Sequence, residues 1–228
     1  MNRTLLLASA AALVLSVGGA ASAKSGQPSV ASPKGTFAQH TVFKTPKGSV
    51  TLYDQNSNDS GSGIVSDNFD SGSFPSYSDQ AADDFSVPSG HKWTVSEVDV
   101  TGIYFNGSGP ADGVNVFFYK DKKGKPGKLV KEIDGATYTD NGTGSFAIKT
   151  GNVKLKNGSY WVSVQADMNF VGGPGEWGWE VNTVQSGNPA MWQNPGGGFG
   201  VCSTWDTLQN CLGFGPDLMF ALKGKDKG

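Results

Sequence analysis

The chain has 228 residues, of which 33 are glycine and only 17% are charged, and its formal net charge at pH 7 is −2. Many glycines and few charges suit short strands joined by turns better than a helical bundle. The mild acidity argues against a nucleic-acid-binding protein, as does the presence of a single arginine, Arg3, because arginine commonly grips phosphates and guanine edges.

Residues 1–23 have the three parts of a cleavable secretory signal peptide. Arg3 supplies the positive n-region, an apolar h-region follows at 5–17, and Ala21-Ser22-Ala23 offers small side chains to signal peptidase. The apolar run is shorter than the roughly 20 residues that a membrane span needs. We therefore expect a secreted or periplasmic protein that has no membrane span and no arginine in its mature form.

The first part of the expected mature chain has little periodic pattern. Residues 24–48 are rich in Ser, Pro, Gly, Lys and Gln, which predicts a flexible lead-in. The domain itself is expected over 49–224, with a charged tail at 225–228. Its first strand is predicted at 49–53, and the Asp-, Asn-, Ser- and Gly-rich stretch 54–72 predicts a polar loop or a set of tight turns.

Strand signals become regular from residue 81 onward. A strand over 82–87 is expected to end at a Pro-Ser-Gly turn, and the segment 93–105 changes its apolar phase between Val95 and Val98, which predicts a bulge. Residues 114–119 are apolar on both faces and predict a central strand. Further strands are expected at 128–133, 145–148, 158–165, 176–181, 190–192 and 217–222. The pattern predicts an all-β domain, a two-sheet antiparallel β-sandwich of jelly-roll type.

Three stretches carry a resemblance to known sequences. They are 81–88 with Trp93 and the strand 98–104, Phe117-Phe118-Tyr119 before a Lys-Gly-Lys-Pro-Gly turn, and the closing segment 216–222. Together they resemble uncharacterised secreted bacterial β-sandwich modules over about residues 53–224. The resemblance implies a jelly-roll-like, carbohydrate-binding-like architecture, and it brings no catalytic residues with it.

The only two cysteines are Cys202 and Cys211. In an oxidising compartment such a pair is expected to form a disulfide that closes a small loop. A metal site is the alternative, but the pair lacks the neighbouring His or Cys ligands that zinc requires. We predict the disulfide.

The residues for nucleophilic or acid–base catalysis are sparse. The only histidines, His40 and His91, fall in the lead-in and in a turn, and no Gly-x-Ser-x-Gly motif is present. Glu176 and Glu180 would share a face of one strand, about 13 Å apart at 3.3 Å per residue, which is too far for a glycosidase pair. A catalytic pair formed by two acids from different strands remains an alternative. We lean against an enzyme.

Hard oxygen ligands gather in the polar stretch that follows the first strand. Calcium binds 6 to 8 oxygens in loops of this composition. The candidate ligands are Asp54, Asp59, Asp67 and Asp70. The alternative is that these residues cap tight turns. Turn capping is the favoured interpretation, and a structural calcium is the one candidate cofactor.

The segment 169–214 concentrates aromatic and amide side chains among glycines. Trp177 and Trp179 would share one face of a strand, where core filling is the favoured interpretation. Trp192 and Trp205 are flanked by glycine-rich and cysteine-loop sequence and are expected to be exposed. Aromatic faces suit stacking on sugar rings, while amides suit hydroxyls. The predicted ligand contacts are Trp192, Gln193, Asn194, Phe199, Trp205 and Asp206.

These observations predict a secreted, non-catalytic binding module whose partner is a polysaccharide or another cell-envelope glycan. One alternative is a glycan-active hydrolase or lyase on a jelly-roll scaffold, which requires two acids facing one cleft. The other is a structural or adhesive surface protein without a small ligand. Burial of every tryptophan would favour this last alternative.

Overall fold

The computed structural model describes residues 26–39, 41–69, 74–171 and 173–228, so the predicted signal peptide lies outside the described residues. These residues form two β-sheets, and the only pairing among the named strands that is not antiparallel is a short parallel one between β3 and β9. The all-β, two-sheet antiparallel prediction is confirmed. The jelly-roll ordering of the strands stays a prediction.

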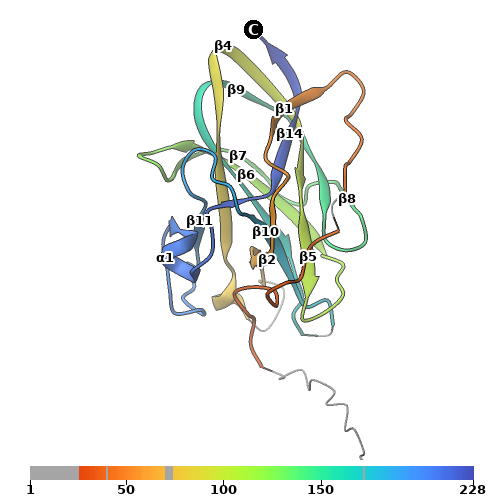
Figure 1. Ribbon diagram of the computed structural model, residues 1–228, viewed down its shortest axis with the longest axis vertical. Helices are drawn as coiled ribbons and strands as arrows, with labels where there is room; N and C mark the ends of the chain where they lie inside the picture. The colour runs from red at the N-terminus through yellow and green to blue at the C-terminus, as the bar shows by residue number, and fades with distance from the viewer. Residues whose placement is uncertain (1–25, 40, 70–73, 172) are drawn as a thin grey trace, which may run out of the picture.

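The larger sheet places its six main strands side by side in the order β1, β14, β4, β9, β6 and β7 (Figure 1). Their bounds are Val50–Asp54, Phe220–Lys227, Gln80–Val100, Phe146–Asp167, Gly113–Asp121 and Pro126–Ile133. The short strands β3 (Asp67–Asn68), β8 (Tyr138–Asp140), β11 (Met191–Gln193) and β12 (Asp206–Thr207) extend this sheet. Residues 114–119 lie in β6 between β9 and β7, as expected for a central strand.

The smaller sheet is built around β10 (Glu176–Asn182). Strand β2 (Asp59–Val65) pairs with it along one edge, while β5 (Gly102–Phe105) and β13 (Asp217–Leu218) pair along the other. Two short helices complete the described elements, η1 (Pro75–Tyr77) and α1 (Leu208–Leu212). None of the described residues belongs to a helix with the length and apolarity needed to cross a membrane.

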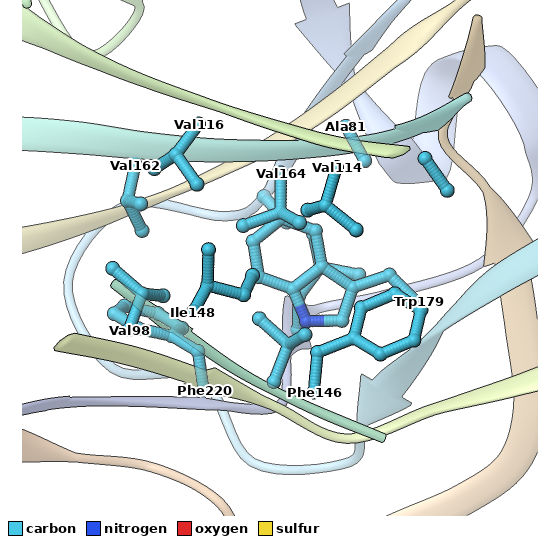
Figure 2. Packing of buried hydrophobic residues seen from close by; sticks show 14 of the residues in the cluster. Ala81, Val98, Val114, Val116, Phe146, Ile148, Val162, Val164, Trp179 and Phe220 are labelled. Atoms are coloured by element: carbon cyan, nitrogen blue, oxygen red, sulfur yellow. The ribbon is translucent and has the colours of Figure 1, made fainter. Parts of the chain in front are cut away.

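The core fills the space between the two sheets (Figure 2). Trp177 and Trp179 point from β10 into it, with their ring centroids 6.3 Å apart. Trp177 stacks on Phe146 of the larger sheet, and Trp179 meets Phe220 edge-on. The interpretation of this tryptophan pair as core filling is therefore confirmed, and aromatic contacts across the sheets join the two layers.

Two irregularities interrupt the long pairing of β4 with β9. The predicted phase change is confirmed, because the register shifts between Val95 and Glu97. The predicted turn at the Pro-Ser-Gly sequence is wrong, since Gly90, at a φ of 83°, lies inside a continuous 21-residue strand where the register shifts between Val87 and Lys92. A bulge absorbs the breaker residues without reversing the chain.

The segment before β1 lies along the sandwich (Figure 1, red to orange). The sequence predicts a flexible lead-in there, but from residue 26 the chain hydrogen-bonds to both sheets. The Ser32 N–H donates to the Gly63 carbonyl at 2.8 Å on the smaller sheet. The Phe43 carbonyl accepts from Lys223 Nζ at 2.8 Å on the larger one. The described part of this segment therefore covers surface on both layers.

Candidate functional site

A hollow of about 510 Å³ lies on the outer face of the larger sheet, the face that points away from the smaller sheet. Strand β6 shows how local sequence creates this face. Val114, Val116 and Phe118 alternate into the core, so Asn115 and Phe117 point outward into the hollow. The sequence of β6 reads as apolar on both faces because its outer face carries phenylalanine as well as an amide.

The floor of the hollow is a band of amides from neighbouring strands. Asn115 of β6 stands opposite Gln165 of β9, and Gln193 of β11 stands opposite Gln80 of β4. Gln193 Nε2 donates to Gln80 Oε1 at 3.0 Å. Gln165 Nε2 donates to the Asp79 carbonyl at 2.6 Å. These bonds hold the amides in place. Asn115 is fastened as well, because it donates to Asp167 Oδ1 and accepts the Gly135 N–H, both at 2.9 Å.

Carboxylates and a glycine loop border this floor. Glu132 and Asp134 line the hollow from the β7 side. Gly196 lines it from the loop after β11, and a Cβ at that position would lie 2.6 Å from the Ser76 carbonyl oxygen. Only glycine lets this loop pack so closely on η1. The charged residues of the lining are all acidic: Asp79, Glu132 and Asp134.

Phe117 begins a row of aromatic rings that leads out of the hollow. Its ring stacks on Tyr119 with centroids 6.3 Å apart, and Tyr119 meets Trp205 edge-on at 6.0 Å. All three side chains are half-buried. The row ends beside the turn between β6 and β7, where Lys125 Nζ donates to the Trp205 carbonyl at 3.2 Å. Flat apolar faces therefore continue the polar hollow along the sheet.

Asp79 lies at the edge of the hollow and is nearly fully buried. Burial raises the pKa of its carboxyl group well above the usual range, against the opposing effect of the hydrogen bond from Trp192. Burial and the neighbouring charge of Asp79 raise the pKa of Asp67 in the same direction. One Asp67 oxygen accepts the Trp177 backbone N–H at 2.9 Å. The two carboxyl groups therefore hold protons more strongly than ordinary aspartates.

The structure does not bring the predicted ligand contacts together on one open surface. The prediction that Trp192 is exposed is wrong, because its side chain is 0% exposed. Its Nε1 donates to the Val65 carbonyl at 3.0 Å and to Asp79 Oδ1 at 3.1 Å. The indole thus bridges the two layers beneath the hollow. Flanking glycines misled the prediction, since Trp192 itself belongs to strand β11.

Asn194 is also buried and has a structural role. Its side-chain amide donates to the carbonyls of Ser76 and Ser78, both at 2.9 Å, and its oxygen accepts the Phe199 N–H. Phe199 is half-buried and packs edge-on against Tyr77, with centroids 4.9 Å apart. These two residues fasten the glycine loop to η1 and are set back from the hollow lining.

Gln193, Trp205 and Asp206 retain partial exposure. Gln193 holds Gln80 at the hollow, and Trp205 ends the aromatic row. Asp206 lies just before α1, where the Thr207 backbone N–H and then the nearby Asn210 and Lys125 lower the pKa of its carboxyl group. Of the six predicted contacts, Trp205 and Gln193 therefore lie nearest the surface that could meet a ligand.

The disulfide between Cys202 and Cys211 is present. It ties the loop that carries Trp205 to α1, a five-residue helix. Thr207 caps the helix start by accepting the Asn210 N–H, and Gly213 ends it in the left-handed conformation. The bond therefore restrains the end of the aromatic row.

The predicted calcium ligands are separated in the structure. Asp54 ends β1, Asp59 begins β2, and Asp67 is buried in β3. Asp54 accepts the Asn56 N–H and Asp59 accepts the Gly61 N–H, which are turn-capping contacts. Asp70 lies outside the described residues. Within the described ranges, no three His, Cys, Asp or Glu side chains are grouped to hold a metal ion.

His91 pairs with a carboxylate, but this pair lies outside the hollow. Its Nδ1 lies 2.7 Å from Asp226 Oδ2 near the C-terminus, away from the hollow. His40 lies outside the described residues. The residues that the sequence argument missed are Phe117, Gln80, Asn115 and Gln165. The alternation of valine with Asn115 and Phe117 in β6 was the available signal.

Comparison of the chain with protein-family models, with curated proteins and with solved structures finds no match.

Proposed function

We propose that this protein is a secreted, non-catalytic module that binds a polysaccharide or cell-envelope glycan in the hollow on the outer face of the larger sheet. The observation that carries the proposal is the combination of a polar hollow of about 510 Å³ with an adjoining row of aromatic rings. Its volume falls in the range of small-ligand sites, about 300–1,000 Å³.

The chemistry of the lining suits sugars. Hydroxyl groups both donate and accept hydrogen bonds, and the amides of Gln80, Asn115 and Gln165 do the same. The ring of Phe117 offers an apolar face for the C–H side of a pyranose, and Tyr119 and Trp205 extend that surface for further units of a polymer. A pre-formed sheet holds these groups, which lowers the entropic cost of binding.

The charge of the lining narrows the class of glycan. Its acidic side chains are Asp79, whose burial favours the protonated form, and the exposed Glu132 and Asp134. Anionic polymers would bring like charges together, which disfavours their binding. Neutral or amino-sugar polymers are therefore the preferred ligands.

The test is retention of the purified protein on insoluble glucan, chitin and an anionic polyuronate. We expect retention on a neutral or amino-sugar polymer and about a tenfold loss of affinity for Phe117→Ala, because hot-spot aromatics contribute at least that much. Gln80→Ala should weaken binding as well. Phe37→Ala is the matched control, since Phe37 is 63% exposed and lies outside the hollow. Thermal unfolding checks that each variant folds.

Three outcomes would contradict the proposal. Retention unchanged by both Phe117→Ala and Gln80→Ala would remove the hollow as the site. Release of reducing sugar, or of unsaturated ends, would favour the hydrolase or lyase, for which Asp79 and Glu132 are the acids to substitute first. A failure to bind any glycan would favour the structural or adhesive surface protein.

A further inference from the structure

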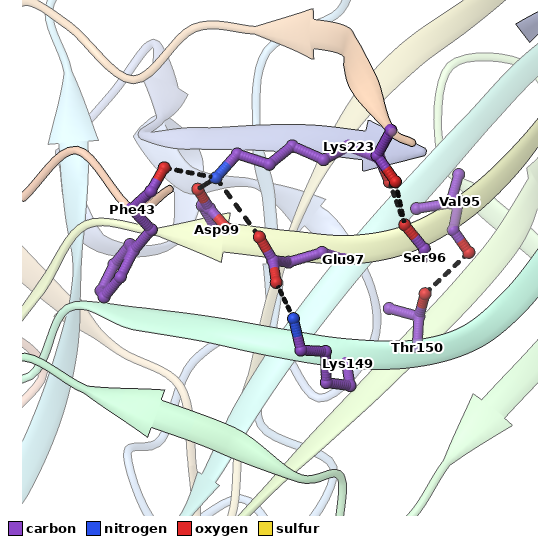
Figure 3. A network of polar contacts seen from close by, with 9 residues as sticks. Phe43, Val95, Ser96, Glu97, Asp99, Lys149, Thr150 and Lys223 are labelled. Carbon is purple, nitrogen blue, oxygen red and sulfur yellow. Dashed lines mark hydrogen bonds and ion pairs between the residues drawn. The ribbon is translucent and has the colours of Figure 1, made fainter. Parts of the chain in front are cut away.

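Three charged side chains are buried together on the outer face of the larger sheet, some way along β4 from the hollow (Figure 3). Glu97, Asp99 and Lys223 are 2%, 3% and 5% exposed. Glu97 and Asp99 are two residues apart on β4, and Lys223 stands opposite Glu97 on β14. Full burial of three ionisable groups at the surface of a sheet requires a cover and a close mutual arrangement.

The chain before β1 provides the cover. The Phe43 carbonyl accepts from Lys223 Nζ at 2.8 Å, and the neighbouring Thr41, Val42 and Thr45 border the same small cavity as Asp99. On the sheet, the residues opposite Asp99 are Ala221 and Ala147, whose short side chains leave room for the covering segment. Water is therefore largely excluded from the three charged groups.

The amine of Lys223 is in contact with the carboxyl group of Asp99. Lys223 Nζ lies 2.5 Å from Asp99 Oδ2 and 3.3 Å from Glu97 Oε1. Lys149, on the other side of Glu97, is 53% exposed and forms an ion pair with the second Glu97 oxygen. Lys149 therefore helps to hold Glu97 beside Lys223 and Asp99.

The surroundings of Asp99 favour the protonated form of its carboxyl group. Burial raises the pKa of Asp99 to about 7, although the hydrogen bond and charge of Lys223 act in the opposite direction. Asp99 Oδ1 is buried and accepts no hydrogen bond from the described residues, while Glu97 is its hydrogen-bonding neighbour. A proton on Asp99 makes it a carboxylic acid, whose hydroxyl group can leave as water.

We propose that Lys223 and Asp99 condense into an intramolecular amide, an isopeptide bond, with Glu97 transferring the protons. The ammonium group of Lys223 first gives a proton to Glu97, and the freed Nζ lone pair attacks Asp99 Cγ. The new C–N bond replaces one C–O bond, and the hydroxyl leaves as water with the proton returned by Glu97. The nitrogen then loses its extra proton to Glu97. An ammonium, a carboxylic acid and the Glu97 carboxylate thus become one amide, one water and a protonated Glu97, which releases that proton to solvent.

The fold supplies what the reaction needs. Contact between amine and acid replaces a bimolecular encounter, which is the usual source of large intramolecular rate gains. Exclusion of water favours the uncharged amide over two buried ions. The product would join β4 covalently to β14 and hence the middle of the chain to its end.

The decisive measurement is the intact mass of the purified protein after denaturation, reduction and alkylation. This mass is compared with the mass calculated from the N-terminal residue found by sequencing the same sample. We expect a mass lower than calculated by one water molecule, and a protease digest containing one branched peptide that joins Asp99 to Lys223. Lys223→Arg and Glu97→Gln should each restore the full mass. Asp99→Asn should still form the amide but lose ammonia in place of water.

Lys149→Arg is the matched control, because it changes a lysine of the same network that does not contact Asp99; it should keep the mass loss. A wild-type protein at its full calculated mass would overturn the proposal, whether or not the variants fold. A mass loss that persists in Lys223→Arg would also overturn it, because it would indicate ring closure at an Asp-Gly sequence elsewhere.

Discussion

Glu97 of β4 and Glu180 of β10 are equally buried, at 2% and 0% exposure, yet their surroundings differ. Glu97 lies between two lysines, Lys223 and Lys149, one on each neighbouring strand. Glu180 faces Asp59, and no ion pair of the described residues includes it. Burial and the charge of Asp59 raise the pKa of Glu180 to about 9.

The comparison shows that burial alone does not decide how a carboxylate is stabilised. Where the register of an antiparallel sheet places lysine opposite the acid, an ion pair forms. Where it places Gly63 opposite, as it does for Glu180, a proton takes the role of the cation. Asp79 resembles Glu180 in that burial raises its pKa, and it differs in accepting a hydrogen bond from the indole of Trp192.

The largest expected effect comes from removing that indole. Trp192→Ala should lower the free energy of unfolding by about 4 kcal/mol, because it leaves a cavity and deprives Asp79 of its donor. Trp205→Ala, at the half-buried end of the aromatic row, should lower it by less than about 1 kcal/mol. Urea unfolding of the two variants checks this. Equal losses would mean that the buried and half-buried tryptophans contribute alike.

Removing the buried amine beside Glu97 and Asp99 should lower the free energy of unfolding somewhat less. Lys223→Met should lower the free energy of unfolding by about 3 kcal/mol, because two carboxyl groups lose their buried partner. Lys149→Met should change it by less than about 1 kcal/mol, since Lys149 is 53% exposed. Denaturant unfolding at pH 7 separates the two, and a similar cost for both would show that burial of the cation is unimportant.

The contribution of Glu180, which has no lysine partner among the described ion pairs, to stability should depend on pH. A folded-state pKa of about 9 for Glu180 exceeds its unfolded value, so its stabilising contribution is complete below about pH 4 and is lost as pH rises toward 9. We expect Glu180→Gln, which mimics the protonated acid, to gain about 2 kcal/mol relative to wild type between about pH 5 and about pH 6.5, because each pH unit in this window changes the free energy of unfolding by about 1.4 kcal/mol.

Thermal unfolding across this pH range tests the difference. Glu132→Gln serves as the control, because Glu132 is exposed and should leave the pH dependence unchanged. Parallel curves for wild type and Glu180→Gln would show that Glu180 is ionised throughout.

Local pattern was enough to predict several parts of the fold. Alternation and turn residues predicted the strands, the phase change at Val95 predicted the bulge, and the cysteine count predicted the disulfide. The aromatic pair Trp177 and Trp179 was also placed correctly in the core. Each of these features depends on residues close together in sequence or on one pair with no alternative partner.

The candidate site could not be predicted in the same way. Phe117, Gln165 and Gln80 come from three strands that only the sheet order brings together, and glycine-rich flanks suggested an exposed Trp192 that the structure buries. The sequence after residue 25 predicted a flexible lead-in because the residues that this segment contacts lie far from it in the sequence.

The sequence by itself therefore determined an all-β architecture, a bulge and a disulfide, because these follow from local side-chain periodicity and from the only available cysteine pair. The tertiary structure alone decided which carboxyl groups meet lysine and which meet another acid, and where the hollow opens. The physical reason is that register and strand order set the neighbours of each side chain, and in a buried setting those neighbours decide its charge.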